Sequence, residues 1–106
     1  MADIIVDSPA SGSIVKSPLT ITGRAKGTWY FEASFPVRLF DDQGNELAVA
    51  PAQAEGDWMT EDYVPFSVTL TFTTTAKTGT LVLEKDNPSG MPENAKSVSN
   101  PVQFAP

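Results

Sequence analysis

The chain has 106 residues and a mass of 11.3 kDa, the size of one domain, and its hydrophobic content of 41% is enough for a packed core. Seven basic residues against 13 acidic ones give a net charge of −6, which argues against nucleic acid as a partner because phosphate binding requires a basic surface. Histidine and cysteine are absent, which excludes disulfides, thiol nucleophiles, the usual zinc sites and imidazole-based acid–base catalysis.

No apolar run approaches the roughly 20 residues that a membrane-spanning helix needs. The opening "MADIIVDSP" lacks the basic start and the long apolar stretch of a signal peptide. We therefore expect a single domain over residues 1–106 that is monomeric, has no membrane span and needs no cofactor.

Alternation of apolar and polar residues, the signature of β-strands, recurs along the chain. It begins with a short strand in "DIIVD", and "LTITGRA" then places Leu19, Ile21, Gly23 and Ala25 on one face. The segment "ELAVAPAQ" is a weaker strand in which Pro51 marks an edge or a break. Later strands present further apolar faces, made of Phe66, Val68, Leu70, Phe72, Leu81, Leu83, Val98, Val102 and Phe104.

Turn clusters rich in Pro, Gly, Asn and Asp separate these segments. The best candidate for a helical turn is "GDWMTED". About seven short strands with such turns predict an all-β fold, an immunoglobulin-like antiparallel β-sandwich that holds together without a disulfide.

The run "WYFEASFPVRLF" at residues 29–40 raises the question of why Glu32 sits among apolar residues. Read as one strand, it places an apolar set inside (Trp29, Phe31, Ala33, Phe35, Val37 and Leu39) and a mostly polar set outside (Tyr30, Glu32, Ser34, Pro36, Arg38 and Phe40). Glu32 then lies on the outer face, with Arg24 or Lys85 as an expected partner. Pro36 predicts a bulge that would shift the phase beyond it.

The connections group at two ends if the chain runs up and down through the sandwich. "AKG", "EGDWMTEDYV" and "DNPSGMPEN" then gather at one end, and "SPASGS", "DDQGN" and "TAKTG" gather at the other. Because variable immunoglobulin domains carry binding loops at one end, the first group is the candidate site.

Acidic residues concentrate between Leu39 and Ala76, where the chain has no Lys or Arg and its net charge is −7. This stretch is a cation site, an acidic face for a basic partner, or a solvated surface that keeps the domain soluble. A calcium site would draw on Glu32, Asp57, Glu61, Asp62 and Asp86, but the chain has no calcium-loop spacing, and we predict no metal ligand.

Aromatic residues in the acidic segment admit two interpretations. Trp58, with Met59 and Tyr63 close by, either plugs the end of the sandwich or anchors a partner, and the plug is the commoner role. The "DNPSG" turn is explained by backbone geometry alone. The candidate binding residues are Glu32, Asp57, Trp58, Glu61, Asp62 and Asn87, and no residue is predicted to be catalytic.

Three pieces of the chain, "WYFEASFPV", "GDWMTED" and "KDNPSG", together with the "SPASGS" turn and the "TG" strand, resemble the immunoglobulin-like domain family associated with bacterial spore germination proteins. That family also occurs in bacterial cell-envelope proteins and lipoproteins. The resemblance implies an extracytoplasmic β-sandwich that serves as a binding or spacer module and is not an enzyme. Its partner would be a protein or a cell-wall component. The alternative is a cation-dependent domain that binds carbohydrate or cell wall through the acidic loops.

Overall fold

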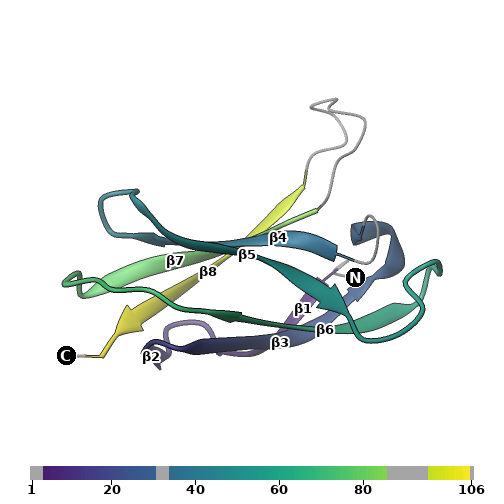
Figure 1. Cartoon of the computed structure of the whole chain (residues 1–106), viewed down its shortest axis with the longest axis horizontal. Helices are drawn as coiled ribbons and strands as arrows, with labels where there is room; N and C mark the ends of the chain where they lie inside the picture. Colours follow the sequence, from purple (N-terminus) through teal and green to yellow (C-terminus); the bar gives the residue numbers. More distant parts are fainter. Residues whose placement is uncertain (1–3, 31–33, 86–95, 106) are drawn as a thin grey trace.

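The computed structural model describes residues 4–30, 34–85 and 96–105. In these ranges eight strands form one curled sheet in the order β1-β3-β6-β5-β4-β7-β8-β2 (Figure 1). The elements are β1 (Ile4–Ser8), β2 (Ile14–Val15), β3 (Leu19–Lys26), the 3₁₀ turn η1 (Gly27–Trp29), β4 (Ser34–Asp41), β5 (Glu46–Ala54), β6 (Tyr63–Leu70), β7 (Thr78–Glu84) and β8 (Ser97–Phe104).

The curled sheet makes two facing layers, with β4, β5 and β7 above β1, β3 and β6 in Figure 1. The layers are joined where β5 pairs with β6, at Gln53–Ser67 and Ala54–Phe66. The N-terminal part of the chain adds a strand to each side of the sandwich: β1 pairs with β3, and β2 pairs in parallel with β8. All other strand pairs are antiparallel. The predicted immunoglobulin-like sandwich without a disulfide is confirmed.

The core forms where the alternating apolar faces of the two layers meet. In β3, Leu19, Ile21 and Ala25 are buried, whereas Thr20 and Arg24 are exposed. The other strands contribute Val64, Phe66, Val68, Leu70, Leu81, Leu83, Val102 and Phe104 in the same way. Burying one such large side chain stabilises the fold by roughly 1.5–3 kcal/mol, which explains how the sheet closes without a covalent link.

Phe35 lies fully buried at the centre of an aromatic cluster. Its ring makes edge-on contacts with Trp29, Tyr30 and Phe66 at centroid distances of 6.4, 5.2 and 5.0 Å. This edge-to-face geometry is the one that aromatic quadrupoles favour. The cluster therefore fixes the start of β4 against η1, against the residue that follows η1, and against the middle of β6.

The prediction that residues 29–40 form one strand is wrong at its start. Trp29 belongs to η1, and β4 begins at Ser34, so the alternation does not run through the segment. Tyr30, predicted to lie outside, is therefore buried, with 4% of its surface exposed. Within β4 the phasing is confirmed, since Phe35, Val37 and Leu39 are fully buried. Phe31, Glu32 and Ala33 lie outside the described residues, as does any contact of Glu32 with Arg24 or Lys85.

The two prolines do not interrupt their strands. Pro36 and Pro51 stand opposite each other in the β4–β5 ladder, and the register continues past both. The register shift predicted at Pro36 lies instead between Leu39 and Phe40. Although a proline cannot donate to a ladder, the pairing on either side of these two is enough to hold β4 against β5.

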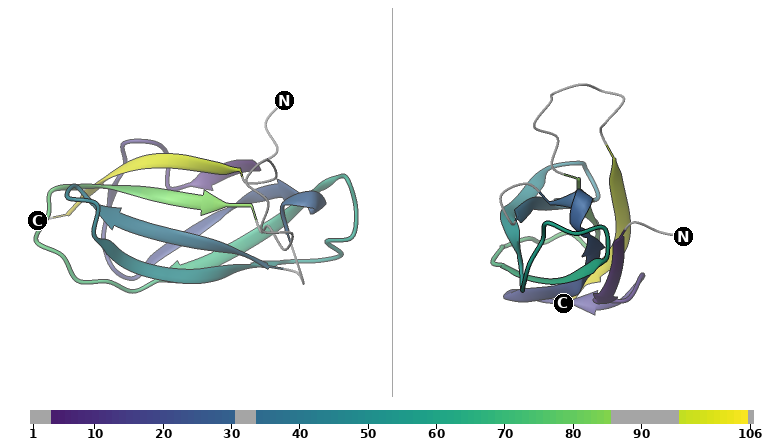
Figure 2. Two further views of the ribbon diagram at one scale, coloured as in Figure 1. Left: turned by 90° about the horizontal axis from the view of Figure 1, so that it is seen from above. Right: turned by 90° about the vertical axis from the view of Figure 1, so that its right-hand side faces the viewer.

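The end of the molecule near the C-terminus gathers the three turns predicted for it. The Gly12 N–H donates to the carbonyl of Pro101 at 2.7 Å, and the Phe104 N–H donates to the carbonyl of Lys77 at 2.9 Å. Asp41, at the start of the "DDQGN" turn, pairs with Gly79. We call this the turn end; it lies opposite η1 (Figure 2).

Candidate functional site

η1 and residues 55–62 meet at the other end of the sandwich, which we call the loop end (Figure 2). The Gly27 N–H donates to the carbonyl oxygen of Asp62 at 3.1 Å, tying the two segments together. The backbone carbonyls of Trp58 and Thr60 lie so close to Gly27 that a Cβ there would overlap both oxygens. A residue without a side chain is therefore required for this approach.

Residues 57–62 hold their shape through local hydrogen bonds. The Asp57 carboxylate accepts a bond from the Met59 N–H at 3.0 Å, and the Thr60 hydroxyl accepts one from the Asp62 N–H at 3.1 Å. These side chains compete with helical bonding for the same donors. The helical turn predicted at "GDWMTED" is accordingly absent from residues 56–62, which form irregular backbone and bends, and the helical turn of this region is η1.

Tyr30 fixes the inner side of the loop end. Its hydroxyl donates to the carbonyl oxygen of Val64 at 2.6 Å, which links η1 to β6. Burial, together with the negative charge of Glu55, raises the pKa of the Tyr30 phenol to about 12. The phenol is therefore protonated at neutral pH and acts as a structural donor.

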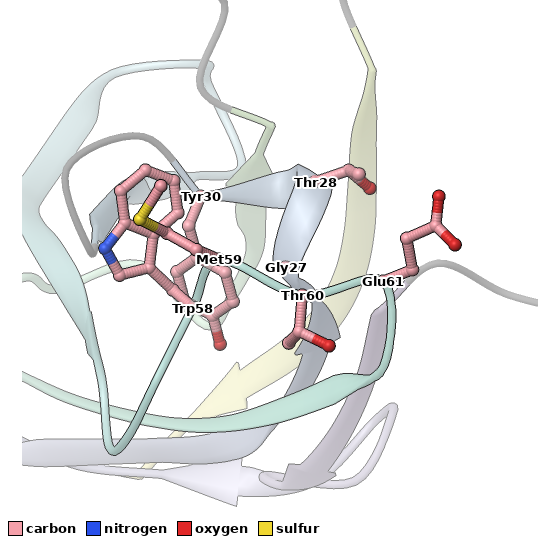
Figure 3. Close-up of a pocket in the computed structure, with 7 residues that line it drawn as sticks. All are labelled: Gly27, Thr28, Tyr30, Trp58, Met59, Thr60 and Glu61. Carbon is pink, nitrogen blue, oxygen red and sulfur yellow. The ribbon is translucent and has the colours of Figure 1, made fainter.

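A pocket of about 340 Å³ opens between the two segments (Figure 3). Its lining is formed by Gly27, Thr28, Tyr30, Trp58, Met59, Thr60 and Glu61. In the close-up the side chains of Trp58 and Met59 project to one side, whereas those of Thr28 and Glu61 project to the other. The pocket thus has an apolar side and a polar side that ends in a carboxylate.

The apolar side is accessible to a partner. Met59 is 77% exposed, the largest exposed fraction among the large hydrophobic residues that the structure leaves on its surface. Trp58 is partly buried and packs against the core while also lining the pocket. The tryptophan that is buried at this end is Trp29, with 3% of its surface exposed. Trp58 therefore closes the end only in part and keeps a surface that a partner can contact.

The structure brings four of the six predicted binding residues together. Asp57, Trp58, Glu61 and Asp62 all lie in the loop end, and the predicted meeting of "AKG" with "EGDWMTEDYV" is observed. The other two residues, Glu32 and Asn87, lie outside the described ranges, as does the "DNPSGMPEN" loop. Tyr63 does not join the pocket, because its ring lies beneath the Lys26 ammonium, 5.9 Å from the ring centroid.

The acidic residues of the central stretch do not form one cluster. Asp41 and Glu46 belong to the turn end, where Asp41 caps its own turn and Glu46 pairs with Arg38 at 2.7 Å. Within residues 4–30, 34–85 and 96–105, no three carboxylates are grouped so that they could hold a metal ion. Glu32 and Asp86, which completed the calcium hypothesis, lie outside these ranges.

The sequence analysis placed Gly27 at this end only as part of the "AKG" loop, and it named neither Gly27 nor Thr28 nor Tyr30 among the binding residues. A glycine two residues before the aromatic pair Trp29–Tyr30 was the available signal, since glycine permits a close backbone approach. The alternation pattern concealed it, because it assigned Trp29 and Tyr30 to opposite faces of one strand, whereas Trp29 belongs to η1.

The chain matches, over residues 3–92, the family described as the immunoglobulin-like domain of bacterial spore germination. In a comparison with curated proteins, no match to the chain was found. In the described part of the chain, no helix is long and apolar enough to cross a membrane.

Proposed function

The chain belongs to the immunoglobulin-like domain family of bacterial spore germination, and we propose that it is a non-enzymatic module that binds its partner through the loop end. The observation that carries this proposal is the pocket beside Trp58 and Met59, where large apolar side chains remain accessible. Exposed aromatic and methionine side chains of this kind serve as anchors at protein interfaces.

Local hydrogen bonds within the loop end support a role in binding. Gly27, Asp57 and Thr60 each fix a backbone group of the loop end through the hydrogen bonds described above. A surface that is already ordered loses little conformational entropy on association. The loop end therefore presents Trp58 and Met59 in a geometry that needs no folding step.

The chemistry of the chain supports a non-enzymatic role. The sequence has no His and no Cys to serve as a base or nucleophile near neutral pH. The Tyr30 phenol has a raised pKa of about 12, the opposite of what activation as a base or nucleophile requires. The described carboxylates are not grouped so as to hold a metal ion, but Glu32 and Asp86 lie outside the described residues, so the cation-dependent alternative stays as the second proposal.

We also propose that the module works outside the cytoplasm, as a single monomeric domain. The family assignment supports the location. Because the chain has no cysteine, a Gln43→Cys variant at the exposed turn end offers one reactive thiol. A membrane-impermeant maleimide should label this variant in intact cells, and light scattering of the purified chain should give a mass near 11.3 kDa.

The binding proposal is tested by affinity capture from cell-envelope extract. The immobilised chain is compared with a Trp58→Leu/Met59→Ser variant and with a Val49→Ser control, since Val49 is an exposed hydrophobic residue away from the loop end. We expect the same partner to be retained by the wild type and the control and lost from the loop-end variant. Equal retention by all three proteins would instead mean that the loop end is not the binding surface.

A further inference from the structure

Exposed acidic side chains are concentrated in one segment of the loop end. Four exposed acidic residues lie in residues 55–62 of the loop end: Glu55, Asp57, Glu61 and Asp62. No Lys or Arg lies in that segment, or anywhere between Leu39 and Ala76. An approaching chain of positive charge is therefore attracted to this end of the molecule.

The pocket combines this charge with an apolar surface. Glu61 lines the same hollow as Trp58 and Met59, and its side chain leaves the pocket on the side opposite to theirs (Figure 3). Among the described residues, no ion pair or hydrogen bond engages the Glu61 carboxylate. The Asp57 carboxylate accepts a bond from the Met59 N–H through Oδ1 and is exposed beside the apolar pair.

A long cationic side chain matches this arrangement. Lys and Arg have an apolar stem that packs on hydrophobic surface and a charged head that stays at the rim. The indole face of a tryptophan attracts such a cation more strongly than the other aromatic rings do. The pocket volume of about 340 Å³ is enough to admit one side chain of this size from an extended segment.

We propose that the loop end recognises a basic, extended segment of a partner protein. A Lys or Arg of that segment lies with its stem against Trp58 and Met59, and the neighbouring positive charges face Asp57 and Glu61. This inference rests on the proposed function, because it names the partner class of the same binding surface. Charge complementarity favours a basic protein segment over an uncharged glycan.

The test uses fluorescein-labelled peptides with the repeats Gly-Lys and Gly-Glu, titrated with the purified chain and followed by fluorescence anisotropy. The loop-end variant is Asp57→Asn/Glu61→Gln. The control is Asp7→Asn/Asp42→Asn, which removes the same amount of charge at two exposed positions away from the pocket. Both loop-end substitutions keep the shape of the native side chains, and the amide oxygen introduced at position 57 can still accept the Met59 N–H.

We expect the Gly-Lys peptide to bind the wild type, and the Gly-Glu peptide to show no binding. Loss of two exposed ion pairs should weaken Gly-Lys binding about fivefold in the loop-end variant, but less than about twofold in the control. Trp58→Leu should weaken it as well, and raising the salt concentration should weaken it for every protein, because exposed charges are screened.

Equal weakening in the loop-end variant and the control would overturn the inference, because the peptide would then respond only to net charge. If no basic peptide binds while affinity capture still depends on Trp58 and Met59, the proposed function stands and the basic partner is wrong. Binding of purified cell-wall fragments that depends on Glu61, without binding of Gly-Lys, would likewise overturn the protein partner in favour of a wall ligand.

Discussion

The turn end and the loop end both contain acidic residues, and they use them differently. At the turn end the Asp41 carboxylate accepts three hydrogen bonds from Gln43 and Asn45, and Glu46 pairs with Arg38 in the middle of β4. At the loop end Glu61 and Met59 face solvent beside a pocket. Asp41 therefore stabilises its turn, and Asp57 likewise holds a backbone N–H at the loop end, whereas Glu61 remains available to a partner. Sequence composition alone does not separate these two roles.

The largest loss of stability is expected from a glycine substitution at the loop end, and the matching substitution at the turn end should cost less. Gly27→Ala should lower the free energy of unfolding by about 2–3 kcal/mol, because the new Cβ would overlap the carbonyls of Trp58 and Thr60. Gly44→Ala in the turn end meets no neighbouring atom but has φ of 82°, so it should cost about 1 kcal/mol. Urea denaturation measures both.

Substitution by asparagine distinguishes the two causes. Asn tolerates positive φ, so Gly44→Asn should be nearly neutral, whereas Gly27→Asn should be as destabilising as Gly27→Ala. If Gly27→Ala were as mild as Gly44→Ala, the close packing of η1 on residues 58–60 would be refuted.

The second prediction concerns the buried phenol at the loop end. Tyr30→Phe should destabilise the fold by about 1–2 kcal/mol, because it leaves the Val64 carbonyl without its 2.6 Å hydrogen bond. The folded-state pKa is raised from 10.0 to about 12, so this contribution is fully present below pH 10 and is lost as pH rises towards 12. Urea melts between pH 8 and pH 11.5 should show the wild type approaching the variant. A constant difference across that range would contradict the assignment.

The third prediction concerns the turn end. Hydrogen bonds from Asn45 and the Gln43 N–H lower the pKa of the Asp41 carboxyl in the folded state. Its stabilising effect is therefore present above the unfolded-state pKa and is lost as pH falls through the lower folded-state value. Asp41→Asn should lower the melting temperature at pH 7, and the gap to wild type should narrow towards pH 3. Asp42→Asn, at a neighbouring exposed position, serves as the control with little expected change.

Substitution of Met59 should have the smallest effect on the free energy of unfolding and still weaken binding of the partner. Met59→Ser should change the free energy of unfolding by less than about 0.5 kcal/mol, because the side chain is 77% exposed. Retention of the partner should nevertheless fall. A large loss of stability in this variant would show that Met59 belongs to the fold, and the contrast between the ends would then weaken.

The fold could be predicted from the sequence because its strands are half-buried and obey a period of two. In β3 and β6, every residue from Leu19 to Ala25 and from Phe66 to Leu70 follows the expected alternation, although β6 ends at Leu70, before Phe72. Asn100 shows the limit of this pattern: it shares the inner phase of Val98 and Val102, yet it is polar and buried. Its amide donates to the carbonyl of Pro9 at 3.0 Å, and a partner 91 residues away leaves no trace in the local pattern.

The site was predictable in part, for the same physical reason. Alternating connections bring the "AKG" turn and residues 55–62 to one end, and this follows from strand order alone. The burial of Tyr30 does not follow. Tyr30 comes directly after η1, where side chains do not alternate between two faces as they do in a strand. Gly27, where η1 begins, also lies against the carbonyls of Trp58 and Thr60, a long-range contact that the local pattern does not reveal.

The central claim, that the loop end and not the turn end contacts the partner, is tested most directly by site-specific photo-crosslinking in the producing cell. A photoreactive amino acid is placed at position 59 in one protein and at position 43 in another, both of which are exposed in the structure. Illumination should give a discrete crosslinked species from position 59, which disappears when Trp58→Leu is added, and none from position 43. A crosslink from position 43 alone, or equal crosslinks from both positions, would contradict the account.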